Sequence, residues 1–192
     1  AGRAASVTGT THISAIDPEG GAAALTLSNG TGAGLVAPGT GIMPNNMLGE
    51  DDLVGGGPLG WTPATRLSSM MSPMCLSWPD GRVAVMGSGG SNRIRTALAQ
   101  VALRRIDHGL PLDEAVAAPR LHVEGTDPPQ VDYERLGLPE AEERALLAAF
   151  PEARGWERPS MFFGGVHGVE RDPGGGLRAA GDARRGGAVA LG

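Results

Sequence analysis

The stretch Val7-Thr8-Gly9-Thr10-Thr11-His12-Ile13-Ser14 places a glycine–threonine junction at the mouth of a predicted strand. A threonine hydroxyl is a weak nucleophile, and it can be activated when its residue becomes the first of a chain, because the freed α-amine then acts as a base. Such an amine has a pKa near ~8 in model peptides, so a small shift leaves it largely neutral at working pH. Without cleavage of the Gly9–Thr10 bond, the same residues are simply a turn glycine followed by β-branched strand residues.

Glycine before the scissile bond suits such a cleavage. Because it has no Cβ, Gly9 can adopt strained backbone geometry that lets the Thr10 side chain approach the Gly9 carbonyl. Nine residues precede Thr10 in the sequence as it stands, so its amine is blocked until that bond breaks. Thr11 is the alternative nucleophile.

Composition limits the class of protein. A chain of 192 residues with 41% hydrophobic content is long enough for one domain with a core and too short to argue for two. The net charge of -5 argues against a nucleic-acid partner. Cys75 is the single cysteine, so no intrachain disulfide can form. No apolar run reaches membrane-spanning length.

Four motifs resemble, in the same order, the small catalytic part of gamma-glutamyltranspeptidases, which are N-terminal-nucleophile hydrolases. They are Thr10-Thr11-His12-Ile13-Ser14, Gly41-Ile42-Met43-Pro44-Asn45-Asn46-Met47, Leu67-Ser68-Ser69-Met70-Met71-Ser72-Pro73 and Gly87-Ser88-Gly89-Gly90-Ser91. The resemblance implies an α/β fold, a four-layer αββα sandwich that is incomplete without a large subunit from the same precursor. Residues 1–9 would be a tail before the processing site, and residues 10–192 a single catalytic domain.

The activity that the resemblance implies is γ-glutamyl transfer or hydrolysis from amides such as glutathione, through an ester on Thr10 and without a cofactor. In the family, an arginine that clamps the substrate lies in the larger preceding region, which this sequence does not contain. The resemblance allows a periplasmic, extracellular or cytoplasmic location, and the abundance of alanine, glycine and arginine is typical of GC-rich, bacterial coding.

A hairpin follows the nucleophile. Residues 11–16 alternate as a strand, Asp17-Pro18-Glu19-Gly20-Gly21 predicts a turn, and residues 22–27 return as the second strand. Thr26 and Ser28 share a face of that strand, so either could hydrogen-bond a nucleophile on the neighbouring one. By resemblance, one of the two is the family's second hydroxyl, and Asn29 is the amide that follows it.

The loop around the paired asparagines carries acids. In the family, an acidic residue shortly after the asparagines holds the α-ammonium of the substrate, and a carboxylate suits a cationic amine. We assign this role to Asp51, with Glu50 as the alternative, and place Asn46 in the same pocket. Met47 stands where the family often has a polar residue. Without the resemblance, this acidic run would be a solvated loop.

Ser68 and Ser69 offer two adjacent hydroxyls, and by resemblance they bind the α-carboxylate of the glutamyl group. Taken alone, they are turn residues before a strand. Residues 74–78 and 83–86 predict a second hairpin around Pro79-Asp80-Gly81.

The Gly87-Ser88-Gly89-Gly90-Ser91 turn joins that hairpin to a predicted helix, which runs from Asn92 to near His108. A strand, a glycine turn and a helix start direct backbone N–H groups and the helix dipole at one spot, where an anion can sit. By resemblance Gly89 and Gly90 stabilise the oxyanion, and losing one such donor costs about 3 kcal/mol in serine proteases. A tight turn that only packs a helix on a sheet is the alternative.

The rest of the chain predicts a short helix at residues 111–119, strands at 121–124 and 131–133, a helix at 139–150, and a last hairpin at 161–170 and 177–180. The end, Gly181-Asp182-Ala183-Arg184-Arg185-Gly186-Gly187, resembles the family's C-terminal segment, and we assign it no chemistry. The four histidines show no metal-ligand spacing, and no G-x-S-x-G turn supports a serine triad.

Three alternatives stay open. One is an acylase of the same fold that acts on glutaryl or other acyl amides, such as cephalosporin-type substrates. The second is a non-catalytic binding homologue, in which the Gly9–Thr10 bond stays intact. The third is a phosphate-binding module on the turn at residues 87–91, although a chain without lysine cannot form a Walker-type loop.

Overall fold

The computed structural model describes residues 9–50, 53–54, 56–57 and 59–192. These residues form a two-stranded ribbon, a four-stranded sheet in the order β3-β4-β8-β9 and a three-stranded sheet in the order β5-β6-β7. The strands are β1 (Thr10–Ile16), β2 (Ala22–Ser28), β3 (Met74–Ser77), β4 (Val83–Gly89), β5 (Leu121–Glu124), β6 (Gln130–Glu134), β7 (Arg154–Trp156), β8 (Gly165–Arg171) and β9 (Leu177–Ala180).

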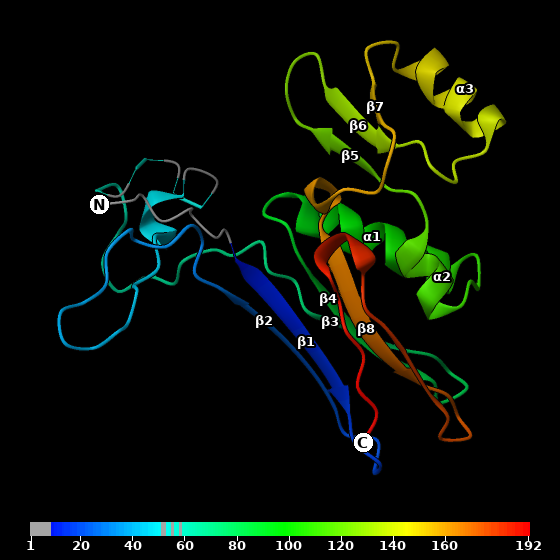
Figure 1. The fold of residues 1–192 in the computed structure, drawn as a ribbon, viewed down its shortest axis with the longest axis horizontal. Coiled ribbons are helices and arrows are strands. Elements are labelled where there is room, and N and C mark those ends of the chain that lie inside the picture. The colour runs from blue at the N-terminus through cyan, green and yellow to red at the C-terminus, as the bar shows by residue number, and fades with distance from the viewer. Residues whose placement is uncertain (1–8, 51–52, 55, 58) are drawn as a thin grey trace.

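Two helices cover one face of the four-stranded sheet, and the β1–β2 ribbon lies against the other (Figure 1). These helices are α1 (Arg93–Ile106) and α2 (Leu112–Ala117), whereas α3 (Glu140–Ala149) lies beside the three-stranded sheet. The described residues thus supply a ribbon, a sheet and one helical layer, and the predicted α/β class is confirmed. None of the described helices is long and apolar enough to cross a bilayer.

β4 is one of the two inner strands of the four-stranded sheet, and its two faces pack against different elements. Ala84 and Met86 are fully buried against α1, where they join the main hydrophobic core. The alternate residues face the ribbon, because successive side chains of a strand point to opposite faces. The core cluster consists of Ala84, Met86, Ile94, Ala97, Leu98, Val101, Leu112, Ala115, Val116, Val166 and Ala180.

Two glycines on the ribbon-facing side of β4 let β1 come close. A Cβ at Gly87 would lie 2.2 Å from the ring of His12, and a Cβ at Gly89 would lie 2.7 Å from the carbonyl oxygen of Thr10. A side chain at either position would therefore push the ribbon away. The pair fixes Thr10 over the end of β4, next to the turn into α1.

Most predicted elements are confirmed, including both N-terminal hairpins and α1. The last hairpin begins later than predicted. Met161–Phe163 forms a 3-10 helix, and β8 starts only at Gly165. The Ser160 hydroxyl accepts a hydrogen bond from the backbone N–H of Phe162, which favours the helical turn over an extended strand.

A buried ionic network connects the C-terminal segment to the three-stranded sheet. Arg120 donates to Asp182 at 2.6 Å, and both side chains are about 1% exposed. Arg184 donates through Nε to Glu134 at 2.7 Å. The network holds the 3-10 helix Ala183–Arg185 beside β8.

Candidate active site

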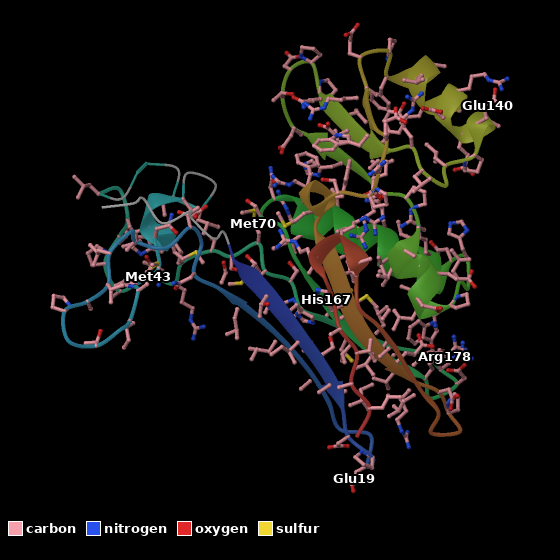
Figure 2. The ribbon with its side chains drawn as sticks, viewed as in Figure 1. Glu19, Met43, Met70, Glu140, His167 and Arg178 are labelled. Carbon is pink, nitrogen blue, oxygen red and sulfur yellow. The ribbon has the colours of Figure 1, made fainter. Side chains whose placement is uncertain are left out.

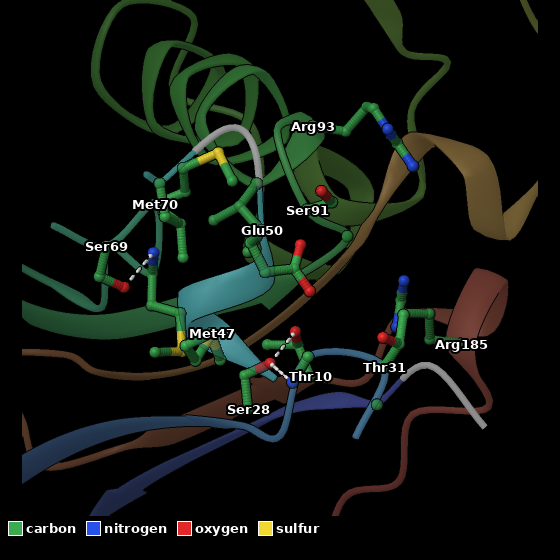
Figure 3. Close-up of a pocket in the computed structure, with 16 residues that line it drawn as sticks. Thr10, Ser28, Thr31, Met47, Glu50, Ser69, Met70, Ser91, Arg93 and Arg185 are labelled. Carbon is green, nitrogen blue, oxygen red and sulfur yellow. Dashed lines mark hydrogen bonds between the residues drawn. The ribbon is translucent and has the colours of Figure 1, made fainter. Parts of the chain in front are cut away.

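Thr10 lies at the start of β1, directly opposite Ser28 at the end of β2. The Thr10 Oγ1 donates a hydrogen bond to the Ser28 Oγ at 3.0 Å, and the Ser28 Oγ also accepts one from the Gly30 N–H at 3.0 Å. Figure 3 shows both hydroxyls at the floor of a pocket. The chain therefore presents a threonine hydroxyl held by a second hydroxyl that is itself fixed by the backbone.

Thr26, the other hydroxyl left open by the sequence, does not reach Thr10. It lies opposite His12 in the hairpin register, and its Oγ1 is 2.7 Å from the His12 Nδ1. The two-residue spacing gives Thr26 and Ser28 the same face, but the antiparallel pairing assigns them to different partners. Thr26 is thus corrected from a partner of the nucleophile to a partner of the buried histidine.

His12 is buried between the ribbon and the sheet, and its other ring nitrogen, Nε2, lies 2.8 Å from the Ser14 Oγ. Burial, together with the charge of His167, lowers the pKa of His12 to about 4. Its ring is therefore neutral at physiological pH. It fills the space above Gly87, and its ring nitrogens are occupied by hydroxyls of the ribbon rather than by Thr10.

The turn from β4 into α1 forms one wall of the pocket. Gly90 and Ser91 line it, whereas Gly89, the last residue of β4, is covered by the Thr10 carbonyl. Gly90 has φ +139 and Ser91 has φ 54. A non-glycine residue at positive φ is uncommon, so Ser91 marks a constrained backbone at this point. The sequence assigned oxyanion stabilisation to Gly89 and Gly90, and the structure places Gly90 of this pair in the pocket lining, beside Ser91.

Ser69 and Glu50 line the pocket, while other predicted residues lie outside its lining. Ser68 is one of these. Asp51, the first choice for the acidic role, lies outside the described residues. Gly30 adopts φ +61, and a Cβ there would come within 2.7 Å of the Glu50 carboxylate, so a larger residue would displace this acid.

The two asparagines hold the glycine-rich loop instead of lining the pocket. Asn46 accepts from the backbone N–H of Thr31 at 2.8 Å and donates to its hydroxyl at 2.6 Å. Asn29 donates to the carbonyl of Met43 at 3.2 Å. Their side-chain amides tie together the two ends of the loop at residues 29–46, so the structure gives them a supporting place in this chain.

The pocket itself has a volume of about 210 Å³ and is partly open. That is smaller than the ~300 Å³ at which drug-sized ligand sites begin, so it fits a group the size of one amino acid. It is lined by Gly9, Thr10, Ser28, Gly30, Thr31, Met47, Glu50, Leu53, Ser69, Met70, Met71, Gly90, Ser91, Arg93, Ile94 and Arg185.

Comparison with known proteins places this site in a family. The family model for gamma-glutamyltranspeptidase matches residues 2–192. The chain belongs to the gamma-glutamyltranspeptidase family. Its curated relatives include the acylase ACY 1 proenzyme of Pseudomonas sp. (strain SE83), 34% identical over 176 residues, which cover 89% of this chain and 30% of that protein. The glutathione hydrolase proenzyme of Escherichia coli (strain K12) is 38% identical over 126 residues, which cover 59% of this chain and 22% of that protein.

Solved structures of the family share the fold. The gamma-glutamyltranspeptidase of Pseudomonas nitroreducens complexed with L-DON matches with a TM-score of 0.76 and 27% identity, covering 94% of this chain and 98% of that one. The T380A mutant of the Helicobacter pylori gamma-glutamyltranspeptidase matches with a TM-score of 0.74 and 28% identity, covering 91% and 99%. The chain thus spans under a third of these curated gamma-glutamyltranspeptidase relatives, yet nearly the whole of the matched structural chains.

Two arginines in the pocket wall were not predicted. Arg93 is the first residue of α1, and Arg185 belongs to the 3-10 helix near the C-terminus. Arg93 comes two residues after the glycine turn at residues 87–91, so its position beside the pocket could have been predicted from the sequence. Arg185 is 95 residues from that turn, and only the buried pairing of its neighbour Arg184 carries it there.

Proposed function

We propose that this chain is the nucleophile-bearing part of an enzyme that transfers or hydrolyses γ-glutamyl groups. The observation that carries the proposal is the Thr10–Ser28 hydrogen bond of 3.0 Å at the floor of a pocket sized for one amino acid. A larger partner, derived from the same precursor, completes the enzyme. The support for this partner is that the relatives are proenzymes of which the chain covers 30% or less.

In the proposed mechanism, cleavage of the Gly9–Thr10 bond first frees the Thr10 amine. Thr10 Oγ1 turns its proton from Ser28 to the amine, which accepts it as Oγ1 attacks the γ-carbonyl carbon, and the Ser28 hydroxyl then donates to Oγ1 and orients it. The negative charge that develops on the carbonyl oxygen falls beside the turn at Gly90 and Ser91, where the dipole of α1 favours an anion. The C–N bond then breaks, and the leaving amine takes the proton.

The resulting γ-glutamyl-threonyl ester is resolved by water or by an acceptor amine. Each attacks the ester carbonyl, loses its proton to the Thr10 amine and regenerates the hydroxyl. In this proposal Glu50 holds the α-ammonium group, since it is the described carboxylate in the pocket wall, and Ser69 contacts the α-carboxylate. Asp51 remains the other candidate for the ammonium contact.

The deciding experiment uses the chain expressed with its natural upstream region. Intact mass and N-terminal sequencing are compared for wild type, Thr10→Ala and the control Thr11→Ala. Thr11 is the right control because it neighbours Thr10 but is exposed and does not line the pocket. We expect a fragment that begins at Thr10 in wild type and Thr11→Ala and is missing from Thr10→Ala. An uncut but folded wild-type chain would refute the mechanism and favour the binding homologue.

A second candidate is an acylase for glutaryl or related amides. It is favoured by the match to the acylase ACY 1 proenzyme, which extends over 89% of the chain, and by the apolar Met47 in the pocket wall. Turnover of a γ-glutamyl anilide and of the matching glutaryl anilide separates the two, because these donors differ only in the α-amine. Faster turnover of the glutaryl donor would identify the acylase.

A further inference from the structure

Two guanidinium groups lie together on one side of the pocket. Figure 3 shows Ser69 on one side of the pocket and Arg93 and Arg185 on the other, and Thr10 lies between Ser69 and the two arginines. Arg185 reaches the turn into α1, since its Nη1 would lie 3.2 Å from a Cβ at Gly89. The pocket therefore has a cationic side that the roles assigned so far leave unused.

Arg185 has no partner for its charge among the described residues. Its side chain makes no hydrogen bond or ion pair with any of them, and its Nε is buried. Its stem packs flat on β8, where a Cβ at Gly165 would lie 2.6 Å from the Arg185 Cδ. Asp182, the acid next in the chain, is instead paired with Arg120 and Arg184. Burial and then the charge of Arg93 lower the pKa of Arg185, yet a guanidinium stays protonated.

Arg93 is held in place by neutral groups. Its Nε donates to the carbonyl of Phe162 at 3.1 Å, its Nη1 donates to the Asn92 side chain, and its guanidinium lies over the Phe162 ring at 4.8 Å. Its Nη2 is bonded to no described residue. Glu124 lies near enough for the charge of Arg93 to help lower its pKa, but its hydrogen bonds are with Asn92 and His122. Arg93 therefore makes no ion pair with an acid among the described residues, and its guanidinium lines the pocket.

We propose that Arg185, assisted by Arg93, binds a carboxylate on the amine half of the substrate and so selects donors and acceptors that carry one there. The inference rests on the proposed function. We assign the amine half of the substrate to the arginine side of Thr10 because Ser69, proposed for the acyl half, lies on the other side (Figure 3). Since this half-buried guanidinium has no acidic partner within the part of the chain that the structure describes, it can take an anion from the substrate, and a planar carboxylate fits its donor fork best.

The test uses the processed enzyme with its upstream region and two anilide donors. One is γ-glutamyl-para-nitroanilide, and the other is the same compound with a carboxylate on the ring. The readout is the ratio of kcat/KM for the carboxylated donor to that for the neutral donor. The variants are Arg185→Gln, Arg185→Lys and the control Arg178→Gln, which changes an exposed arginine of β9 far from the pocket (Figure 2).

We expect Arg185→Gln to lower the ratio about tenfold, the loss of one charge-assisted hydrogen bond. Arg185→Lys should restore part of it, and Arg178→Gln should leave it at the wild-type value. An unchanged ratio in Arg185→Gln would overturn the proposal. An equal fall in kcat/KM for both donors would also overturn the proposal. If that fall came with reduced processing of the precursor, it would mean that a carboxylate of the partner subunit occupies the arginines.

Failure of the proposed function gives a different result. In that case the wild-type enzyme turns over neither γ-glutamyl donor, and the same ratio is measured with the glutaryl pair of anilides. The leaving groups are identical in the two series, so the effect of Arg185→Gln on carboxylate preference is read independently of the acyl group. A glutaryl ratio unaffected by Arg185→Gln would then overturn the inference.

Discussion

The carbonyl oxygen of Thr10 occupies the space in which a side chain at Gly89 would begin, 2.7 Å from the position of its Cβ. This close approach fixes how near Thr10 lies to the turn into α1. Backbone packing, rather than a side-chain contact, therefore positions Thr10 against the proposed oxyanion site.

Gly89→Ala should displace Thr10 and impair both processing and turnover. A shift of about 1 Å in a reacting group can cost about a hundredfold in rate, and we expect a loss of that order in kcat/KM. Gly125→Ala is the control, because a Cβ there meets nothing within 4 Å. Processing is followed by intact mass and folding by circular dichroism. Normal turnover in a folded Gly89→Ala enzyme would contradict the packing argument.

Ser28→Ala should slow the chemistry, whereas Thr26→Val should not. Ser28 accepts the Thr10 hydrogen bond at 3.0 Å, and Thr26 is bonded to His12 instead. We expect kcat to fall at least about tenfold for Ser28→Ala, as for loss of a group that orients a nucleophile. For Thr26→Val we expect a stability loss of about 1 kcal/mol, the usual contribution of one hydrogen bond. Single-turnover kinetics and urea unfolding measure the two effects. Equal loss of kcat in both variants would show that the hairpin register does not decide the role.

Glu50→Gln should act on one class of donor. If its carboxylate holds the α-ammonium, the change lowers kcat/KM for a γ-glutamyl anilide by about tenfold or more and spares the glutaryl anilide, which has no amine. Asp51→Asn, made beside it, assigns the role between the two acids. A parallel loss on both donors would show that Glu50 supports the loop and not the substrate.

Asp182→Asn should destabilise the protein strongly. The Asp182 side chain is 1% exposed and faces both Arg120 and Arg184, so the change leaves buried cations without their partner. Breaking such a pair typically costs about 3 kcal/mol or more. Urea unfolding of the processed enzyme checks this, with the exposed pair variant Asp80→Asn as control, for which surface ion pairs predict less than about 1 kcal/mol. A loss below 1 kcal/mol for Asp182→Asn would contradict the network's role.

Stability should fall with acidification between about pH 6.5 and pH 4. The pKa of His12 is lowered to about 4 in the folded state, so the unfolded chain binds a proton through this range and the folded chain does not. The stabilisation is complete above the unfolded value and is lost as the pH drops toward the folded one. Melting temperatures at pH 7.5 and pH 5 test this, and His12→Asn should narrow the difference. His167, whose pKa burial also lowers, adds to the remaining slope. An undiminished difference in His12→Asn would refute the assignment.

The sequence by itself predicted most of the local elements and singled out Thr10 as the candidate nucleophile. The hairpin at residues 11–27, the strand–glycine–helix turn and α1 follow from period-two and period-3.6 patterns and from turn residues, which act over a few neighbours along the chain. Thr10 could be proposed as the nucleophile because the Gly–Thr junction and the order of the motifs are features of the sequence itself. The choice between Thr26 and Ser28 stayed open because their spacing places them on the same face of the strand but does not say which of them pairs with Thr10.

Only the tertiary structure decided the partners across space. Antiparallel pairing brought Ser28 to Thr10, and two glycines of β4 let the ribbon approach the sheet. The same packing turned Asn29 and Asn46 toward the loop and placed Ser91 beside Gly90 in the pocket lining. Arg185 reached the pocket because its neighbour Arg184 is held by a buried carboxylate 50 residues away. Such contacts join residues that are far apart in the sequence. The spacing of residues along the chain does not say which distant residues come together.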